Sequence, residues 1–479
     1  MASLRSILLF AVMVHVIFHF DVGDCNWFLQ ITDVHYDMYY QANTDPATSC
    51  HRGVGNAGPF GHRGYCDSPL ALVKGILSEI SSGMTKDNSQ VNFNNGSYPT
   101  PDFILWTGDN ARHNNDPLLY RTEQELWSEV STVSTLMAKN FPKISIVPAI
   151  GNNDIFPHDT LGPKEPKYQS WVLGNLTNFW KGFLSPDEIS TFSTGGYYVR
   201  SFNSQLDIVS LNTIYWTKND INGTSNCSVT SSVGLLQLQW LEKVLISAQS
   251  QGKGVLISGH IPPDPSFYFG DCYEQYVTIS GTYKAVIVAH IYAHTHADQF
   301  MILRSISDPL QPAAGVVHVA PSVVPTFNPS IRWYQYTTPS SSPLSLAAKT
   351  SPSGAYSKSS KHGHSTNEVP SLLNYSQLYQ NIDTANKNGA LQLKQEYTAP
   401  SDLTKLVPQF QNLSLSSHQN LEDALLANIF ALQQYIEYLS VSSLNISVYS
   451  SHKGGAGALS DIFRIPCGRT LDPSSPFCR

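Results

Sequence analysis

Short apolar runs alternate with helical stretches over residues 27–336. Most of these runs have few polar interruptions. This is typical of strands covered on both faces, because a strand with one face in water alternates apolar and polar residues. The helical stretches between the runs provide covering layers. The pattern predicts an α/β fold with strands at 27–32, 102–107, 143–150, 206–212, 253–259, 285–293 and 315–321.

Three segments carry the signals of amphipathic helices. Residues 67–83 begin with Asp67, a residue type that caps helix N-termini, and have Pro69 in the first turn. Residues 122–140 and 420–440 show helical spacing of apolar positions. The last of these helices is expected to pack back on the core.

The composition changes at residues 337–366, which are rich in Ser and Pro and poor in large apolar side chains. Such a stretch predicts a linker or a surface excursion. It divides the chain into a larger domain at 26–336 and an accessory region at 367–479, which we expect to be mainly helical.

The N-terminal residues have the layout of a targeting segment. Arg5 precedes a 13-residue apolar run at 8–20, and the small residue Gly23 follows. This layout predicts a signal peptide at 1–23, or an uncleaved signal-anchor that would tie the chain to a membrane. The chain is therefore expected in the secretory pathway, either in a vacuole or lysosome lumen or secreted.

Glycosylation motifs and cysteines agree with this compartment. Asn-x-Ser/Thr motifs outside the predicted strands indicate a glycoprotein, and seven cysteines fit an oxidising environment. The motifs are at Asn95, Asn175, Asn222, Asn226, Asn374, Asn412 and Asn445. The order of the cysteines suggests Cys50–Cys66, Cys227–Cys272 and Cys467–Cys478, with Cys25 left over, although sequence alone leaves the pairing open.

Charge excludes one class of partner. The formal net charge is −7, and no dense run of Lys and Arg occurs anywhere in the chain. A nucleic-acid-binding surface needs such a basic patch. We therefore expect no nucleic-acid partner.

Five of the predicted strands run directly into polar residues of one chemical kind. Because the carboxyl ends of strands in an α/β sheet face a common crevice, these residues can converge. Together they supply carboxylate, amide and imidazole groups, all of them oxygen or nitrogen donors. The residues are Asp33 and His35, Asp109 and Asn110, Asn152, His260, and His294 with His296.

This set of donors suits two divalent metal ions. A carboxylate such as that of Asp109 can bridge both ions, while histidine and asparagine fill the remaining positions. Nitrogen and oxygen ligands are compatible with Zn, Mn, Fe or Co, so the sequence does not identify the metal. A pair of such ions polarises a phosphoryl group and activates water at neutral pH.

Several motifs resemble those of the calcineurin-like metallophosphoesterases, in the branch that contains acid sphingomyelinase-like phosphodiesterases and fungal vacuolar endopolyphosphatases. The match to the endopolyphosphatases is closer. The motifs are "FLQITDVHYDMYY", "DFILWTGDNARHNND", "VPAIGNNDIFPH", "SGHIPP" and "PSVVPTFNPSIRWYQY". The resemblance covers roughly residues 27–336. It implies two central mixed sheets flanked by helices, with 26–336 as the catalytic domain and a smaller, mainly helical C-terminal region.

The resemblance also implies the distribution of metal ligands. One metal would take Asp33, His35, Asp109 and His296, and the other Asp109, Asn152, His260 and His294. Ala293 stands where these enzymes usually have glycine, a small change that should be tolerated. The ending "AHTHAD" is more similar to the sphingomyelinase branch.

Three further residues are expected to take part in catalysis. By the resemblance, His113, four residues after Asp109, contacts the phosphate or helps the leaving group. Arg112 is expected either to touch the substrate phosphate or to be an ordinary solvated loop residue. Asn153 stands where a catalytic histidine is often found. Its amide cannot act as an acid but can hydrogen-bond a phosphate oxygen, which favours an anhydride substrate with a weakly basic leaving group.

Three functions are compatible with the sequence. The first is an endopolyphosphatase that cleaves internal bonds of inorganic polyphosphate. The second is a sphingomyelinase-like phosphodiesterase acting on phosphocholine lipids or nucleotides. It is weakened by the expectation that no saposin-like lipid-binding segment fits between the signal and Asp33. The third is a catalytically inactive binding glycoprotein, which the complete ligand set disfavours.

Overall fold

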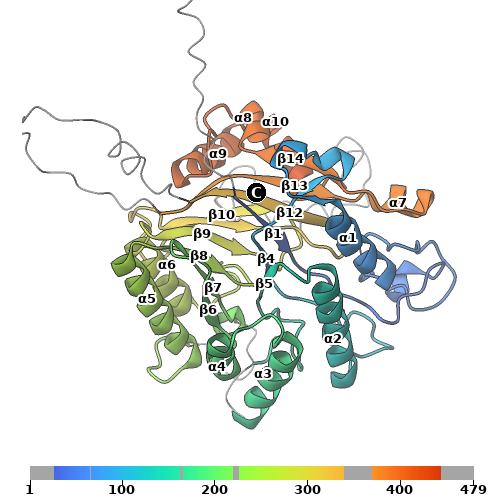
Figure 1. The fold of residues 1–479 in the computed structure, drawn as a ribbon, viewed down its shortest axis with the longest axis horizontal. Helices are drawn as coiled ribbons and strands as arrows, with labels where there is room; N and C mark the ends of the chain where they lie inside the picture. The colour runs from blue at the N-terminus through green and yellow to red at the C-terminus, as the bar shows by residue number, and fades with distance from the viewer. Residues whose placement is uncertain (1–25, 65, 162–165, 219–225, 339–368, 444–479) are drawn as a thin grey trace, which may run out of the picture.

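The structure is a computed structural model that describes residues 26–64, 66–161, 166–218, 226–338 and 369–443. Two six-stranded mixed sheets form its centre (Figure 1). The first has the order β14 (Lys394–Ala399), β13 (Ser371–Tyr379), β12 (Ser330–Thr337), β1 (Asn26–Ile31), β4 (Phe103–Trp106), β5 (Ser145–Pro148). The second has the order β10 (Gln299–Leu303), β11 (Gly315–Val319), β9 (Ile287–Tyr292), β8 (Gly254–Ser258), β7 (Leu206–Ser210), β6 (Tyr198–Ser201).

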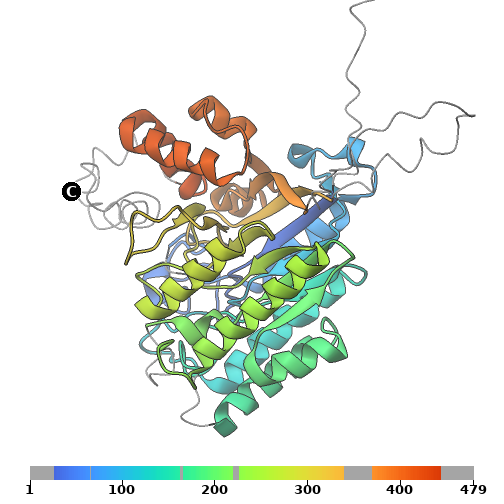
Figure 2. The same ribbon diagram turned by 90° about the vertical axis from the view of Figure 1, so that its left-hand side faces the viewer.

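Helices cover the outer faces of the two sheets. In Figure 1, α1 and α2 flank the first sheet, α5 and α6 flank the second, and α3 and α4 lie below them. Figure 2 is viewed from the side of α5 and α6, which lie next to each other, and shows the C-terminal helices as a separate layer above. The long helices are α1 (Leu70–Gly83), α2 (Glu123–Asn140), α3 (Pro166–Trp180), α4 (Pro186–Gly195), α5 (Val233–Gln251) and α6 (Gly270–Thr282).

The C-terminal helices are α7 (Ile382–Asn388), α8 (Ser401–Leu406), α9 (Leu415–Ala427) and α10 (Ile429–Leu439). A two-stranded sheet joins β2 (Met84–Thr85) to β3 (Tyr98–Pro99). Short 3-10 turns lie at Pro46–Thr48, Asn88–Gln90, Phe93–Asn95 and Thr213–Trp216.

All seven predicted strands are present, and the expected fold class is confirmed. Their continuous apolar character has a simple cause. Each sheet packs one face against the other sheet and the opposite face against helices, so the central strands are largely buried on both faces. In the strands that lead to the site, β4 and β8 are buried along their whole length.

The C-terminal region adds two strands to its helices. β13 pairs antiparallel with β12, and β14 continues the same sheet. The single helix expected at 420–440 is instead α9 followed by α10. The break falls at Asn428, whose side chain accepts hydrogen bonds from Phe430 N and Ala431 N and so caps the second helix.

The prediction that Asp67 caps the first helix is wrong. α1 begins at Leu70, with Pro69 in the N-cap position and no side-chain cap bond. The Asp67 carboxylate instead accepts hydrogen bonds from His113.

Two of the three suggested disulfides are confirmed. Cys50 bonds to Cys66, and Cys227 bonds to Cys272. Cys25 and the Cys467–Cys478 pair lie outside the described residues, as do the N-terminal segment at 1–23 and nearly all of the Ser/Pro-rich stretch.

One glycosylation motif, that of Asn374, lies inside a strand, against our expectation. This residue is part of β13, and its side-chain nitrogen donates to Gln335 Oε1 at 2.5 Å. Across the described part of the chain, no helix combines the length and the apolar character needed to span a membrane.

Candidate functional site

The seven expected metal ligands lie close together where five parallel strands end. β1, β4 and β5 deliver ligands from the first sheet, and β8 and β9 deliver them from the second. Since the carboxyl ends of both sets of parallel strands meet at one edge of the sandwich, residues far apart in sequence come together. Asp33, Asp109 and Asn152 come from the first sheet, and His260 and His294 from the second.

The backbone of the ligands is held in a rare conformation. Five of them have positive φ: Asp33 (48°), His35 (42°), Asp109 (58°), His294 (76°) and His296 (59°). Non-glycine residues adopt this region at an energetic cost, and such strain gathers at functional sites.

Close approach of the chain also requires glycine beside the ligands. A Cβ on Gly151 would lie 2.1 Å from Asp109 Oδ1, and one on Gly108 would lie 2.5 Å from the backbone nitrogen of Gly151. A side chain at Gly151 would displace Asp109, and one at Gly108 would displace the backbone at Gly151.

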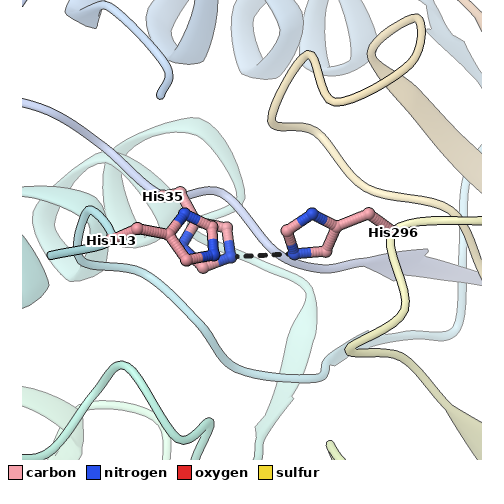
Figure 3. Close-up of side chains that lie close together, drawn as sticks. All are labelled: His35, His113 and His296. Atoms are coloured by element: carbon pink, nitrogen blue, oxygen red, sulfur yellow. Dashed lines mark hydrogen bonds between the residues drawn. The ribbon is translucent and has the colours of Figure 1, made fainter. Parts of the chain in front are cut away.

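The first group of donors centres on two imidazoles. His35 Nδ1 is 3.0 Å from the carbonyl oxygen of Ala111, which can only accept, so the proton of a neutral His35 is on Nδ1. His296 Nδ1 is 2.7 Å from the hydroxyl of Thr326. The two Nε2 atoms then face each other at 3.1 Å (Figure 3), and Asp33 Oδ1 is 3.3 Å from that of His296.

The second group has the same organisation. His260 Nδ1 is 2.7 Å from the carbonyl oxygen of Thr107, which directs its Nε2 into the site. That Nε2 is 3.0 Å from Asn152 Oδ1. His294 joins His260 and Asp109 in a cluster whose donor atoms all lie within 4.8 Å of one another.

Asp109 lies between the two groups. Its Oδ2 is 3.4 Å from His35 Nε2 and 3.2 Å from His260 Nε2. One carboxylate oxygen therefore serves both sets of donors, as a bridging ligand must.

The donor set fits two cations on two further grounds. Asp33 Oδ1 is buried and has no hydrogen-bond partner, which is costly for a carboxylate oxygen unless a cation binds it. In the first group, the Nε2 atoms of His35 and His296 face each other at 3.1 Å, and in the second, His260 Nε2 faces Asn152 Oδ1 at 3.0 Å, so each pair offers two atoms that can bind one cation. The His/Asp cluster thus supports two divalent metals.

The electrostatics of the site also favour bound cations. Burial lowers the pKa of His260, but Asp109 and Asp33 outweigh it and raise the pKa to about 9, so these carboxylates stabilise a nearby positive charge. Burial would raise the pKa of Asp33, yet His260 and His296 hold it below its usual range. Burial lowers the pKa of His294 to about 3 and that of His35 to about 4, so both stay neutral, as metal ligands must.

His113 lies beside the first group of donors. Its ring stacks on His35 with centroids 3.8 Å apart, and its centroid is 5.4 Å from that of His296 (Figure 3). Asp67 accepts hydrogen bonds from its Nδ1 and its backbone nitrogen, both at 2.7 Å. Burial lowers the pKa of His113, but Asp67 outweighs it and the pKa is raised. With Nδ1 bound to Asp67, Nε2 is the other ring nitrogen, and donor atoms of His113, His35 and His296, one from each, lie within 4.8 Å of one another.

Arg112 is not brought to the site. Its guanidinium is buried, pairs with Glu125 of α2, and donates to the carbonyl oxygens of His113 (3.0 Å) and Leu119 (2.9 Å). A buried cation needs a carboxylate partner, and α2 supplies it. Neither of our two expectations, substrate contact or solvated loop residue, describes this position. The side chain holds the loop that carries His113.

Asn153 also differs from our expectation. Its backbone nitrogen donates to Asp109 Oδ1 at 2.8 Å, and its Nδ2 donates to Asp109 Oδ2 at 2.7 Å. The carboxylate of Asp109 is the nearest strong acceptor, and it takes the amide that we assigned to a substrate phosphate. Asn153 orients the shared ligand.

Several residues that support the proposed metal ligands and His113 were not predicted from the sequence. Asp154 accepts hydrogen bonds from the backbone nitrogens of Asp109 (2.9 Å), Asn110 (2.7 Å) and Gly151 (3.0 Å), and burial followed by the nearby charge of Asp109 raises its pKa to about 6. Its position directly after Asn152 and Asn153 in "GNND" could have suggested a role at the site. Nothing in the sequence pointed to Asp67 as the partner of His113 or to Thr326 as the partner of His296.

Comparisons with known proteins agree with the metal site described above. A family model described as calcineurin-like phosphoesterase matches residues 27–298. An endopolyphosphatase of Debaryomyces hansenii is 32% identical over 293 residues, which is 58% of this chain and 38% of that protein. Sphingomyelin phosphodiesterase A of Dictyostelium discoideum is 29% identical over 429 residues, 88% of this chain and 64% of that protein.

A third relative, sphingomyelinase phosphodiesterase C of Dictyostelium discoideum, is 30% identical over 337 residues, 64% of this chain and 69% of that protein. The chain therefore spans well under half of the Debaryomyces endopolyphosphatase and about two thirds of the two Dictyostelium proteins.

Proposed function

Because the chain belongs to the calcineurin-like phosphoesterase family, we propose that it is a metal-dependent endopolyphosphatase. It would use water to hydrolyse internal phosphoanhydride bonds of inorganic polyphosphate. The observation that carries the hydrolase proposal is the position of Asp109 Oδ2 between two sets of inward-facing donors.

Each set of donors would hold one divalent ion, Zn, Mn, Fe or Co. Asp33, His35, Asp109 and His296 would hold the first, and Asp109, Asn152, His260 and His294 the second. When bound, the two ions polarise the phosphoryl group and activate the attacking water. The buried carbonyl and hydroxyl partners of the three imidazoles fix which ring nitrogen faces the ions.

His113 would assist the leaving group. Asp67 occupies its Nδ1, so Nε2 is the atom that donates a proton or a hydrogen bond to the departing oxygen. Burial lowers the pKa of His113, but Asp67 outweighs burial and raises it, which favours the protonated ring.

The choice of an anhydride substrate follows from what stands next to Asn152. An alkyl phosphodiester expels a basic alkoxide, which benefits from a second acid, whereas a phosphate chain is a weakly basic leaving group. Here the neighbouring position is Asn153, and its amide is already committed to Asp109. One imidazole, that of His113, suffices for an anhydride. The endopolyphosphatase relatives at about 32% identity support the same choice.

A second candidate function is a phosphodiesterase that acts on phosphocholine lipids. Two observations favour it: the sphingomyelin phosphodiesterase relative matches 88% of the chain, and the loops that border the site carry exposed apolar side chains. These are Met38 (43% exposed) and Tyr39 (37%) after β1, and Leu118 (77%) and Tyr120 (69%) after His113. An amphiphilic substrate would use such a rim.

For location, we propose that the protein enters the secretory pathway and acts in a vacuole or lysosome lumen or outside the cell. The two disulfides support an oxidising compartment.

One experiment separates these functions. The kcat/KM of the purified protein is measured on long-chain polyphosphate and on sphingomyelin vesicles, with Asp109→Asn as the inactive control. We expect a clear preference for polyphosphate and no turnover by the control. Equal or better hydrolysis of sphingomyelin would favour the phosphodiesterase. Less than one metal equivalent per chain in the purified protein, with no turnover of either substrate, would support an inactive binding protein.

A further inference from the structure

A histidine outside the expected ligand set lies at the edge of the second group of donors. His158 Nε2 is 2.7 Å from Asn152 Nδ2, and its Nδ1 is 3.4 Å from Asp159 Oδ2. The His158 side chain is 44% exposed, so it borders solvent while touching an expected metal ligand. It is neither one of the expected metal ligands nor the residue proposed to assist the leaving group.

The contact matters because an asparagine amide has two ends of nearly the same shape but opposite polarity. Only Oδ1 can bind a cation, while Nδ2 is a donor that must face an acceptor. If the amide of Asn152 were turned around, its NH2 group would point at the second metal position and repel the ion. Something must therefore hold the amide in one orientation.

The surroundings of Asn152 specify that orientation. Asp159 has a carboxylate that only accepts, which favours the proton of His158 on Nδ1 and leaves Nε2 as an acceptor. Nε2 can then accept from Asn152 Nδ2. This directs Asn152 Oδ1 toward His260 Nε2, at 3.0 Å, where the second donor set converges.

The backbone keeps this arrangement compact. The nitrogen of Asp159 donates to the carbonyl oxygen of Asn152 at 3.4 Å, and the hydroxyl of Thr160 donates to that of His158 at 3.1 Å. His158 therefore folds back onto Asn152, in the loop that follows β5.

We propose that His158 is a positioning residue that fixes the amide of Asn152 with Oδ1 toward the second metal position. It thereby strengthens binding of that metal and leaves the first site unchanged. The inference rests on the proposed function, since it requires two metal sites. His35, His260 and His296 are oriented by backbone carbonyls or a hydroxyl, whereas the orienting partner of Asn152 is a half-exposed imidazole.

Two matched variants test the proposal. His158→Leu keeps much of the side-chain volume but removes the acceptor, and His158→Gln can place an amide oxygen near the position of Nε2. The full-length protein loaded with Mn²⁺ is equilibrated against buffers of set free Mn²⁺. Bound Mn per chain is read by elemental analysis, and the paired and isolated ions are distinguished by electron paramagnetic resonance.

We expect the wild type to hold two Mn²⁺ with the signal of a coupled pair. His158→Leu should lose its second ion at roughly 10–100-fold higher free Mn²⁺, the usual effect of removing a residue that orients a ligand. The first ion should bind as in the wild type, and His158→Gln should stay within about threefold of the wild type for both ions.

Three results would overturn the inference. One is a second-site affinity in His158→Leu within threefold of the wild type, and another is equal weakening of both sites. The third is a His158→Gln variant as weak as His158→Leu, which would show that the acceptor is not what matters. A wild type that binds fewer than two ions would refute the two-metal proposal itself and is distinguishable from these results.

Discussion

At the scale of single residues, the carboxylate of Asp67 controls the proton affinity of His113. It accepts hydrogen bonds from both Nδ1 and the backbone nitrogen of that residue. Burial alone would lower the pKa of the imidazole, and the carboxylate outweighs this effect and raises it. The protonated form of His113 therefore persists to higher pH than it would without Asp67.

Asp67→Asn should lower kcat by roughly tenfold or more, since it weakens an acid that acts in the transition state. It should also move the alkaline limb of the pH–kcat/KM profile to lower pH, because the acid form is lost sooner. Asp207→Asn is a suitable control, since Asp207 is also buried and pairs with Lys253 at 2.8 Å, but it lies near the start of β7, at the end opposite the carboxyl edge of the sheet. An unmoved alkaline limb in Asp67→Asn would contradict the role of His113.

A second prediction at this scale concerns Asn153, which holds both oxygens of Asp109. We expect Asn153→Ala to reduce kcat/KM for polyphosphate and for an alkyl phosphodiester by a similar factor of about 10–100, because it loosens the shared ligand. The test is to measure kcat/KM on both substrates for the wild type and for Asn153→Ala. A change in the ratio of polyphosphatase to diesterase activity would instead support a direct contact between Asn153 and the substrate.

At the scale of elements, the loop between β1 and α1 is tied down just before it reaches Asp67. Cys66 bonds to Cys50 across a separation of 16 residues. His51 hydrogen-bonds both Asp37 (2.8 Å) and Asp116 (2.7 Å), which joins this loop to the one that carries His113. The position of Asp67 therefore depends on the whole loop.

Replacing Cys50 and Cys66 by serine should lower the free energy of unfolding by about 3 kcal/mol, as expected for a closed loop of this length. It should also lower kcat, because Asp67 is less well placed. The matched control replaces Cys227 and Cys272, which close a separation of 45 residues at the start of α6 and should affect stability while leaving kcat near wild type. Denaturant titration and steady-state kinetics on both double variants measure this. Equal kcat in the two would argue against coupling between the loop and the site.

At the scale of the whole molecule, the C-terminal region and the larger domain share one sheet. β13 and β14 extend the sheet beyond β12. Arg332 of β12 is buried against Asp298, which follows His296 by two residues and also accepts from Tyr397 of β14. Removing the C-terminal strands would leave this ion pair and the apolar edge of β12 uncovered.

We therefore expect a chain of residues 26–338 to be insoluble or to melt far below a chain of residues 26–443. Solubility on expression and the midpoint of thermal unfolding test this. A truncated chain that stays folded and binds metal would show that the larger domain is an independent folding unit.

We expect the contact between the C-terminal helices and the second sheet to weaken in acid, because it buries His418. His418 of α9 is buried, packs against Phe300 and Phe410, and has a pKa lowered by burial from 6.5 to about 4. The unfolded chain binds this proton below about pH 6.5 and the folded chain only below about pH 4, so stability falls as pH decreases between these values.

His418→Phe should abolish this contribution. Between pH 6.5 and pH 5, it should lose about 1.5 kcal/mol less stability than the wild type, although it forgoes the hydrogen bond to Ser414 O at both pH values. Denaturant titrations of both proteins at the two pH values give the comparison. Equal losses of stability in the two proteins would show that a group other than His418 causes the acid sensitivity.

The sequence by itself determined the features that depend on neighbours in the chain. Buried strands appear as apolar runs, and Asp33, Asp109, Asn152, His260 and His294 follow the strand ends within a few residues, so both could be predicted together. A parallel strand must deliver its last residues to the carboxyl edge of its sheet, which is why the location of the site could also be predicted.

Only the tertiary structure decided what each polar group contacts. Asp67 reaches His113 across 46 residues, and Asn153 reaches Asp109 across 44, so neither pairing leaves a local pattern. Asp67 resembled a helix cap, and Asn153 resembled a substrate ligand, because their residue types allow both roles. A buried polar group takes the partner that the packed sheets and loops bring nearest, and the order of residues along the chain does not encode that distance.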